Sequence, residues 1–321
     1  MKPASQPLDD IAADEWDALV RGSPDGWVFS LHGWQRIVTG VADWGFVERG
    51  FGLREGRRLV AVVPLHFRPT HGVMASSGWG GSGPVIAGGL TKTHRERLFD
   101  AALDHALALS EEDGATNLDM SCWPVTTASL GNRWSVNPFA LRGYEDQSLL
   151  SQVIDLSGGE AALWAGLSQS ARQAVRKARE AGYRAVRVDW LENLETYYAA
   201  HVETYRRTGV SPHPRAYFEG IARLTAPAGA SVLFAAVDPQ GRPKAFHNDA
   251  RLLPGATYHT GCSFSDARDL GLDYLLMWEA LRDAAAEGHG WYDCGWIFPG
   301  ASDGKQRGLT LFKTRFGGEP H

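Results

Sequence analysis

The residues best placed to do chemistry stand at the end of the chain, in the run LFKTRFGGE. Lys313 lies there between Phe312 and Phe316, and two glycines follow. We expect a strand, on which alternate side chains face opposite sides, so that Lys313 and Arg315 would point to water. The residues alone favour that arrangement, since lysines are seldom buried. The alternative is a functional lysine, because an ammonium held beside a developing oxyanion contributes on the order of 3 kcal/mol.

A run of polar residues, His247-Asn248-Asp249, interrupts a segment that otherwise has the pattern of a core strand. Buried polar groups need hydrogen-bond partners, so these residues form either a structural cluster or part of a substrate pocket. The chain contains no Gly-x-Ser-x-Gly and no evident pairing of a cysteine with a histidine. The sequence therefore does not indicate a catalytic triad with a serine or cysteine nucleophile.

Basic residues gather between positions 168 and 188, against the single acid Glu180. One interpretation is a solvated helix face, although such faces usually carry interleaved acids. The other is a local contact surface for a polyanion. The basic residues are Arg172, Arg176, Lys177, Arg179, Arg184 and Arg187.

A second unusual segment, residues 76–89, holds six glycines in SSGWGGSGPVIAGG. A Gly-rich loop can cradle phosphate, but the Lys-Ser/Thr pair that follows a P-loop is missing. We therefore expect a flexible rim loop rather than a phosphate site.

The elements that must position these residues follow a repeated order. In the second half we expect a helix over 160–181, then strands at 231–237, 243–252 and 256–264, a helix over 272–287 and a strand at 291–296. The first half has strands around 46–67, a helix over 93–112 and a strand at 116–122. An acid follows the helix in both halves, at Asp119 and Asp293. A duplicated α/β unit is the economical explanation.

Composition fits two domains in a reducing compartment. The chain has 321 residues, 44% of them apolar, and we divide it into domains of residues 1–152 and 153–321. A net charge of −5 excludes a generally basic nucleic-acid coat but permits a local basic groove. The three cysteines predict buried free thiols. Without a signal peptide or a membrane-length apolar stretch, we expect a cytoplasmic protein.

Three segments, in this order, resemble the FemAB/FemX type of acyltransferase: LSQSARQAVRKAREAGYRAVRV, LGLDYLLMWEALRDAAAEGHGWYDCGW and GLTLFKTRFGGE. The resemblance covers roughly residues 14–319. It implies an α/β fold with two GNAT-like (acyl-CoA N-acyltransferase-like) domains in tandem. Some members insert a coiled-coil arm between helices. No long heptad pattern occurs here, so the chain resembles the arm-free type.

The resemblance also implies an activity. Members of this family move an aminoacyl group from aminoacyl-tRNA to an amine, usually on a peptidoglycan precursor, and more distant relatives are thought to use acyl-CoA. Because the ester or thioester is already activated, the site needs only to orient the reactants, keep the amine neutral and stabilise the oxyanion. We therefore expect direct attack without a covalent enzyme intermediate, and no cofactor or metal.

By the same resemblance, Lys313 corresponds to a lysine that contacts the acyl donor, which reverses the preference for a solvent-facing side chain. Tyr258 matches a strand tyrosine and would donate a hydrogen bond to the reacting carbonyl. Asp293 either receives the amine proton or caps a neighbouring turn. We also expect donor contacts from Phe312, Trp296, Arg172, Arg176 and Lys177, and acceptor contacts from Trp34, Arg207, His247 and Asn248.

The loop before the helix over 272–287 bears on the choice of donor. A GNAT domain that uses acetyl-CoA normally has an Arg/Gln-x-x-Gly-x-Gly/Ala loop, whose backbone N–H groups hold pyrophosphate. Here the loop reads Arg268-Asp269-Leu270-Gly271-Leu272-Asp273. The two carboxylates would repel a pyrophosphate while suiting the helix dipole. This favours a tRNA donor, with an acyl-CoA-dependent N-acyltransferase as the alternative.

Overall fold

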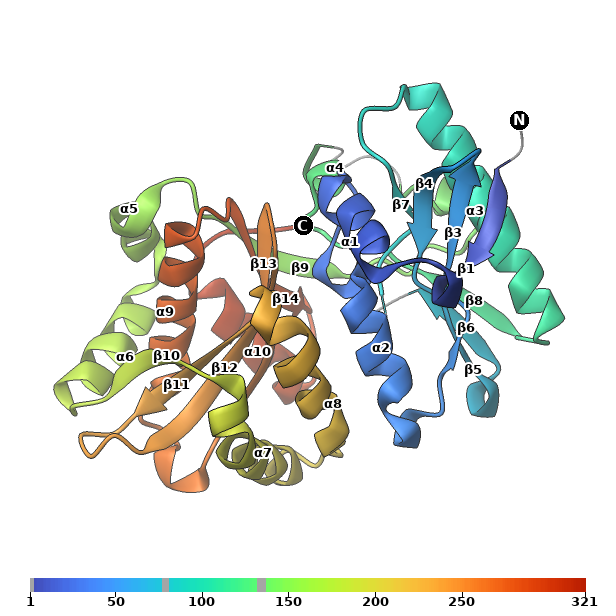
Figure 1. Ribbon diagram of the computed structural model, residues 1–321. Helices are drawn as coiled ribbons and strands as arrows, with labels where there is room; N and C mark the ends of the chain where they lie inside the picture. Colours follow the sequence, from blue (N-terminus) through green and yellow to red (C-terminus); the bar gives the residue numbers. More distant parts are fainter. Residues whose placement is uncertain (1–2, 77–80, 132–136) are drawn as a thin grey trace. The chain divides into compact units, whose positions relative to one another are not determined.

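The computed structural model describes residues 3–76, 81–131 and 137–321 (Figure 1). The chain forms two compact units, residues 1–133 and 134–321. The sequence-based boundary, after residue 152, falls later, inside strand β9 (Leu150–Asp155) of the second unit. Within the described ranges, no helix combines the length and apolarity needed to cross a bilayer.

The described residues of the N-terminal unit form two small sheets and four α-helices. Its first sheet has the order β1-β3-β4-β7 and its second the order β2-β5-β6-β8. The strands are β1 (Ala4–Pro7), β2 (Val47–Glu48), β3 (Phe51–Glu55), β4 (Arg58–Val63), β5 (His66–Arg68), β6 (Val73–Ser76), β7 (Val85–Ile86) and β8 (Asn117–Met120). The helices are α1 (Ala13–Gly22), α2 (His32–Gly40), α3 (Lys92–Glu112) and α4 (Thr127–Gly131).

Helix α3 supplies much of the apolar core of this unit. Thr91 caps its start by accepting a hydrogen bond from the His94 backbone N–H. Leu98, Ala102 and Ala106 are buried at helical spacing and pack with residues of β3, β4 and β7. The predicted helix over 93–112 is confirmed.

The C-terminal unit is built on one seven-stranded sheet of order β10-β11-β12-β13-β14-β9-β15. All neighbouring strands are antiparallel except β13 and β14, which are parallel. The strands are β9, β10 (Arg184–Val188), β11 (Ser231–Val237), β12 (Pro243–Leu252), β13 (Gly255–Ser263), β14 (Trp291–Ile297) and β15 (Glu319–Pro320). The helices are α5 (Gly159–Gly166), α6 (Gln169–Glu180), α7 (Trp190–Arg207), α8 (Arg215–Gly220), α9 (Leu272–Ala286) and α10 (Gly304–Thr314).

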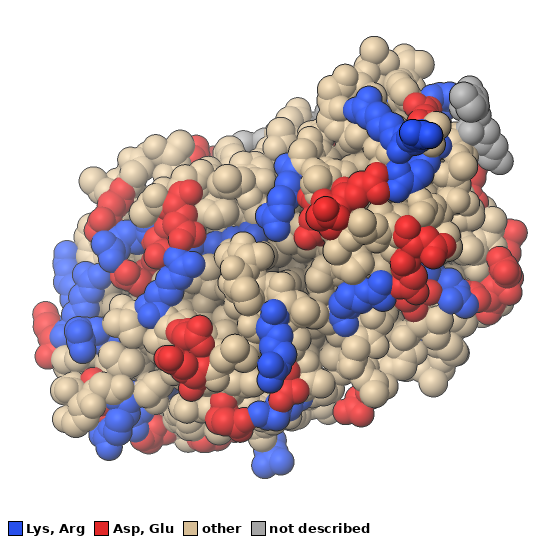
Figure 2. All heavy atoms as spheres, in the orientation of Figure 1, with Lys and Arg blue, Asp and Glu red and all other residues tan. Residues whose placement is uncertain are grey.

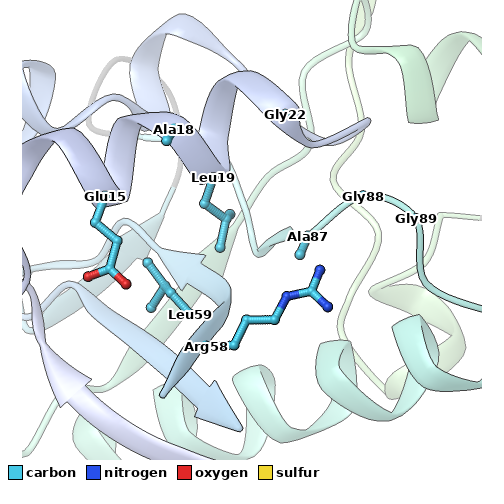
Figure 3. A pocket seen from close by; sticks show the side chains of 9 residues that line it. All are labelled: Glu15, Ala18, Leu19, Gly22, Arg58, Leu59, Ala87, Gly88 and Gly89. Atoms are coloured by element: carbon cyan, nitrogen blue, oxygen red, sulfur yellow. The ribbon is translucent and has the colours of Figure 1, made fainter. Parts of the chain in front are cut away.

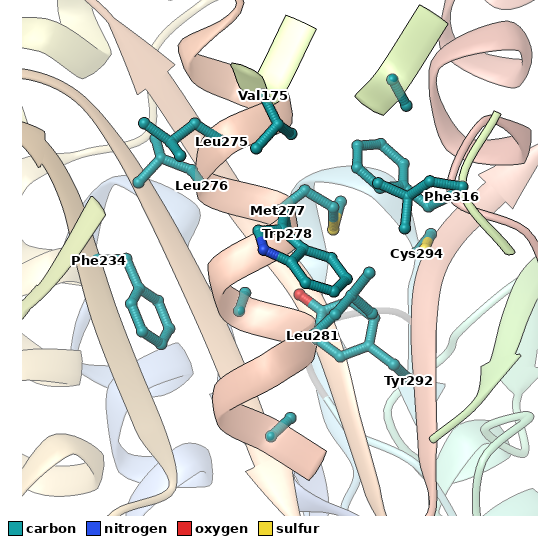
Figure 4. Packing of buried hydrophobic residues seen from close by; sticks show 14 of the residues in the cluster. Val175, Phe234, Leu275, Leu276, Met277, Trp278, Leu281, Tyr292, Cys294 and Phe316 are labelled. Carbon is teal, nitrogen blue, oxygen red and sulfur yellow. The ribbon is translucent and has the colours of Figure 1, made fainter. Parts of the chain in front are cut away.

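The core of this unit centres on α9, which is buried along most of its length (Figure 4). Trp278 and Leu281 pack in one cluster with Phe234 of the sheet and Val175 of α6. Phe316, just beyond α10, belongs to the same cluster. The end of α10 therefore packs against the core between α9 and the sheet.

The prediction that LFKTRFGGE forms a strand is wrong. Residues 304–314 form helix α10, which Asp303 caps by accepting a hydrogen bond from the Gln306 backbone N–H. Two aromatics four residues apart share a face on a strand and also on a helix, so Phe312 and Phe316 did not separate the two structures. Gly317 and Gly318 adopt positive φ and end the helical segment.

The single helix predicted over 160–181 is two helices. Leu167 is extended between α5 and α6, and Ser168 then caps α6 by accepting a hydrogen bond from the Ala171 backbone N–H. Leu163 of α5 and Ala171 and Ala178 of α6 are all buried and belong to the core cluster around α9. The apolar spacing therefore continues across the break, because both helices pack on α9.

The two units do repeat the predicted order of elements. Helix α3 precedes β8, which pairs in parallel with β6, and α9 connects β13 to its parallel neighbour β14. Asp119 and Asp293 occupy the strand after the helix in their respective units. Asp119 is exposed, whereas Asp293 is fully buried, so the two acids differ in their surroundings.

The expectation of three buried thiols is correct for Cys262 and Cys294 only. Cys122, which follows β8, is exposed. Its apolar neighbours suggested burial, but the strand ends at Met120 and the chain leaves the sheet there.

Candidate active site

The site centres on the place where β13 and β14 part. These parallel strands pair only through Gly255–Thr257 and Trp291–Asp293. Beyond that point β13 continues along β12 to Ser263, and β14 continues along β9 to Ile297. The main chains of two central strands therefore diverge directly after the pair of Thr257 and Asp293.

Lys313 reaches this point from α10. Its side chain is 9% exposed, and its Nζ donates a hydrogen bond to the Trp296 carbonyl oxygen at 2.7 Å. Gly295, at φ +85°, allows this approach, because a Cβ there would lie 3.0 Å from the Lys313 Nζ. Burial lowers the pKa of Lys313, and Asp293 acts in the opposite direction. The predicted site lysine is thus directed inward, although it lies on a helix.

Asp293 shapes the same turn. It is fully buried, and its carboxylate accepts a hydrogen bond from the Gly295 backbone N–H at 2.7 Å and another from the Thr257 hydroxyl at 3.3 Å. Burial raises its pKa, while the Gly295 N–H, the Lys313 charge and the Ser151 hydroxyl lower it. Of the two roles considered for Asp293, the turn-capping contact is present in the structure.

Three aromatic side chains cluster at the C-terminal end of α10, which carries Lys313. Phe312, Phe316 and Tyr274 form a cluster with ring centroids 5.1 to 5.5 Å apart. The Tyr274 hydroxyl accepts a hydrogen bond from Arg315 at 2.5 Å. Trp296, whose carbonyl holds Lys313, keeps 49% of its surface exposed. Of the predicted donor contacts, Trp296 therefore meets Lys313 through its carbonyl oxygen, whereas the Phe312 ring packs with Tyr274 and Phe316.

Tyr258 lies on β13 just beyond the last pair with β14. Its ring stands 4.6 Å from the His247 ring, and its hydroxyl extends toward Gly261, where a Cβ would lie 2.2 Å away. Burial raises the pKa of Tyr258. A neutral phenol in this position remains a hydrogen-bond donor over the physiological pH range.

His247 belongs to a buried polar network on the α9 side of the sheet. Its Nε2 lies 2.7 Å from Asp249 Oδ1 and 2.9 Å from the Tyr292 hydroxyl. Arg251 donates to Asp249 and extends the network to Asp283. Burial acts to raise the pKa of Asp249, but His247 and Arg251 lower it overall. This arrangement matches the structural cluster considered for the polar run.

Asn248 points to the opposite face of the sheet, toward α7 and α8. It is fully buried and donates to the Thr260 hydroxyl at 3.2 Å, with His259 Nδ1 at 3.1 Å. Tyr197 hydrogen-bonds the same Thr260 hydroxyl. His247 and Asn248, both predicted acceptor contacts, are therefore interior residues and do not meet on one face.

The remaining acceptor candidates lie elsewhere. Arg207 is exposed at the end of α7 and donates hydrogen bonds to Ser263 and Ser265, just beyond β13. Trp34, on α2, is fully buried in the N-terminal unit with its ring 4.6 Å from Phe29. Trp34 therefore packs in the core of that unit in this structure.

The predicted basic run spans α6 and β10, and Figure 2 shows lysines and arginines where Figure 1 places α6. Arg172 donates to carbonyls at the end of α5, including that of Ala165 at 3.1 Å. Arg176 stacks over Trp164 at 5.6 Å. Lys177 and Arg179 are exposed and have no acidic partner in the part of the chain that the structure describes. Arg184 of β10 is likewise exposed and without an acidic partner among the described residues, so Lys177, Arg179 and Arg184 are the accessible, unpaired part of the run.

The start of α9 carries acids where an anion would otherwise bind. Asp269 and Asp273 are both exposed, and Gly271 between them adopts φ +71°. A Cβ on Gly271 would lie 3.2 Å from the Ala174 carbonyl oxygen, so α6 packs closely against this turn. The helix dipole favours Asp273 in the first turn of α9 and the local charge disfavours a phosphate.

Sequence reasoning missed Thr257, Ser151 and Gly295. Each contributes through strand register, and none belongs to a recognisable motif. Across the described ranges, no three His, Cys, Asp or Glu side chains gather as a candidate metal site.

Comparison with known proteins supports the fold. Residues 166–306 match the family described as acetyltransferase (GNAT) domain. The FemX crystal structure is similar over 99% of this chain and 94% of its own, with a TM-score of 0.74 and 15% identity. The structure of L-PGS from Bacillus licheniformis is similar over 96% and 89%, with a TM-score of 0.57 and 11% identity.

A third similar structure is a tandem GNAT protein from the clavulanic acid biosynthesis pathway, with a TM-score of 0.52 and 14% identity over 99% of this chain and 95% of its own. No curated protein sequence matches the chain. The chain thus has the tandem GNAT fold that it shares with these structures, and residues 166–306 of its C-terminal unit are similar to an acetyltransferase (GNAT) domain.

Proposed function

We propose that the protein transfers an aminoacyl group from a charged tRNA to the amine of a small-molecule or peptide acceptor. The observation that carries this proposal is the buried ammonium of Lys313, held at the point where β13 and β14 part. Parting strands leave room for an acyl group between them, and an adjacent cation favours the tetrahedral oxyanion.

The reaction is direct attack. The neutral acceptor amine adds to the ester carbonyl and the C–N bond forms. The bond between the carbonyl carbon and the ribose oxygen then breaks, and the proton lost by the amine nitrogen ends on that oxygen, so that the products are the amide and a free ribose hydroxyl. Lys313 stabilises the oxyanion, and the Tyr258 hydroxyl is a second donor on the neighbouring strand. We assign Asp293 to holding the turn of Gly295 and Trp296, because its carboxylate is fully buried and already hydrogen-bonded there.

The choice of tRNA over CoA rests on charge. Asp269 and Asp273 are exposed at the start of α9, where a pyrophosphate would need positive potential. Lys177 and Arg179 are available on α6 for phosphates of a polyanion. The half-exposed Trp296, or Phe312, offers a ring on which a terminal adenine can stack. A tRNA donor would also set the reaction in the cytoplasm.

The acceptor is proposed only by class. The chain shares the fold of FemX and L-PGS, and the sequence resemblance to the FemAB/FemX family implies an amine acceptor such as a cell-wall precursor. Arg207, exposed beyond β13, is the remaining accessible residue among the predicted acceptor contacts. A peptidoglycan precursor and a secondary metabolite both fit a peptide or small-molecule amine.

The second candidate is an acyl-CoA-dependent N-acyltransferase. The match of residues 166–306 to an acetyltransferase family favours it. It requires CoA to bind despite the acids at the start of α9.

The donor assay separates the two candidates. The protein is incubated with a cell extract as acceptor source, together with either a pool of labelled aminoacyl-tRNA or labelled acetyl-CoA. We expect label in a hydroxylamine-resistant amide product only from aminoacyl-tRNA, and labelling that is about 100-fold slower with Lys313→Met. Transfer from acetyl-CoA with tRNA inert would contradict the proposal and establish the second candidate.

A further inference from the structure

The N-terminal unit contains a groove of about 470 Å³ that takes no part in the proposed reaction (Figure 3). It lies between α1, the start of β4 and the turn that follows β7. Its volume falls within the range of small-molecule sites. The lining residues are Glu15, Ala18, Leu19, Gly22, Arg58, Leu59, Ala87, Gly88 and Gly89.

One side of the groove carries an uncompensated positive charge. Arg58 is exposed, and no acidic side chain of the described residues pairs with it. Figure 3 shows its guanidinium extending toward Ala87. Glu15, the only acid in the lining, is engaged by both terminal nitrogens of Arg54 at 2.5 and 2.8 Å. An anion entering the groove would therefore meet Arg58 as its available counter-charge.

The same side offers main-chain donors. The backbone N–H groups of Gly88 and Gly89 donate to no acceptor among the described residues, whereas that of Ala87 donates to Val60. A Cβ on Gly88 would lie 2.6 Å from the Gly22 carbonyl oxygen, and Gly89 adopts φ +74°. Glycines thus permit a close turn, and the two glycines with unpaired N–H groups line the groove together with Arg58. Successive free amides of this kind form concave anion sites.

The opposite side is apolar. Ala18 and Leu19 from α1 and Leu59 from β4 line it without a charged group of their own. Apolar surface in such a groove favours a hydrocarbon segment, since burying it removes area from water.

We propose that this groove binds a small organic carboxylate. The carboxylate is held by Arg58 and the amides of Gly88 and Gly89, and the hydrocarbon body lies against Ala18, Leu19 and Leu59. The site is distinct from the proposed catalytic residues, because all of its residues belong to the N-terminal unit, whereas Lys313 and Asp293 belong to the C-terminal unit.

Hexanoate titrated into the ¹⁵N-labelled full-length protein tests the proposal, with hexylamine and hexanol as matched probes. We expect saturable amide shifts at Gly88 and Gly89 with hexanoate, and at least tenfold weaker binding of hexylamine and hexanol. Arg58→Gln should weaken hexanoate at least tenfold. Arg57→Gln, which removes the neighbouring exposed arginine outside the groove, should leave it unchanged.

A second variant blocks the groove without changing its charge. Ala18 is exposed on α1, so Ala18→Trp should fill the groove without disturbing the core, and should abolish the hexanoate shifts. The proposal is overturned if hexanoate gives no saturable shift at these glycines, if hexylamine binds as tightly as hexanoate, if folded Arg58→Gln binds hexanoate with undiminished affinity, or if the shifts persist in folded Ala18→Trp.

Discussion

The Nζ of Lys313 lies 2.7 Å from the carbonyl oxygen of Trp296, across the turn that Asp293 caps through Gly295. A lysine near the C-terminus of the chain is thereby anchored to the strand that parts from β13. The carbonyl uses one of the three ammonium hydrogens, and the ammonium retains donors for a substrate. The ammonium of Lys313 is therefore already in position before the substrate reacts. A charge that is fixed in advance stabilises a transition state without further movement of the protein.

Replacing Lys313 by methionine should lower kcat/KM about 100-fold, which corresponds to about 3 kcal/mol of lost transition-state stabilisation. Methionine keeps an unbranched apolar stem but removes the ammonium. The measurement is the steady-state rate of amide formation with each donor.

Lys305→Met is the matched control, because Lys305 is exposed on the same helix. Its rate should equal that of the unmodified protein. A folded Lys313→Met variant with an undiminished rate would remove Lys313 from the reaction.

Replacing Asp293 by asparagine should shift the alkaline limit of activity to lower pH. The Asp293 carboxylate raises the pKa of Lys313, against the larger lowering by burial, so its removal lets that pKa fall further. If the reaction needs protonated Lys313, the rate is lost as pH rises through a lower pKa. The pH–rate profile of kcat/KM measures the shift.

Thr257→Val provides the comparison for Asp293→Asn. It removes one hydrogen bond to the Asp293 carboxylate but leaves the charge in place. Its alkaline limit should stay near that of the unmodified protein. Equal shifts in the two variants would show that the hydrogen bond, rather than the charge, controls Lys313.

The sequence predicts the central elements well because their patterns are local. Strands 231–237 and 243–252 have the predicted bounds, and the helix predicted over 272–287 is α9. Buried strands and an apolar helix are set by periodicity within a few residues. The C-terminal helix was missed because its two aromatics have a spacing compatible with both periods.

The site was predictable only where a residue belongs to a motif. Lys313 and Asp293 were selected from the sequence, and the structure brings both to the same turn. Thr257 and Ser151 come to Asp293 through pairing with strands distant in sequence, so no local pattern identifies them. Trp34 was selected by its type, yet its ring packs in the core, since large aromatics are more often core residues than ligand contacts.

Replacing Lys177 and Arg179 together by alanine should weaken tRNA binding and reduce the slope of log K against log salt concentration by about 1.5. Both are exposed and without an acidic partner among the described residues, so each is free to release a counterion on binding. Arg172 is left in place because its contacts with carbonyls of α5 are structural. Filter binding over a range of salt concentrations gives the slope.

The double variant Arg57→Ala with Lys92→Ala removes the same charge from exposed positions of the N-terminal unit. It should leave the slope unchanged. If the α6 variant also leaves it unchanged, the basic run is a solvated helix face.

Replacing Glu48 by glutamine should stabilise the N-terminal unit increasingly as pH rises from 4.5 to 7. Burial raises the pKa of Glu48 from 4.5 to about 7, so the folded protein binds a proton that the unfolded chain releases over this range. The unmodified protein therefore loses stability as pH rises, by about 3 kcal/mol at most. Glutamine does not titrate and avoids this loss.

His66, which lies close to Glu48, contributes to the pH dependence of stability with the opposite sign. Burial lowers the pKa of His66 to about 4, and its Nε2 lies 3.9 Å from the Glu48 carboxylate. A lowered histidine pKa has the opposite sign, because the unfolded chain binds the extra proton as pH falls below 6.5. The two contributions oppose each other in the unmodified protein, so Glu48→Gln should expose a stability that rises with pH between 4 and 6.5. Denaturant midpoints at several pH values test this, and a difference between variant and unmodified protein that does not grow with pH would show that Glu48 is ionised when buried.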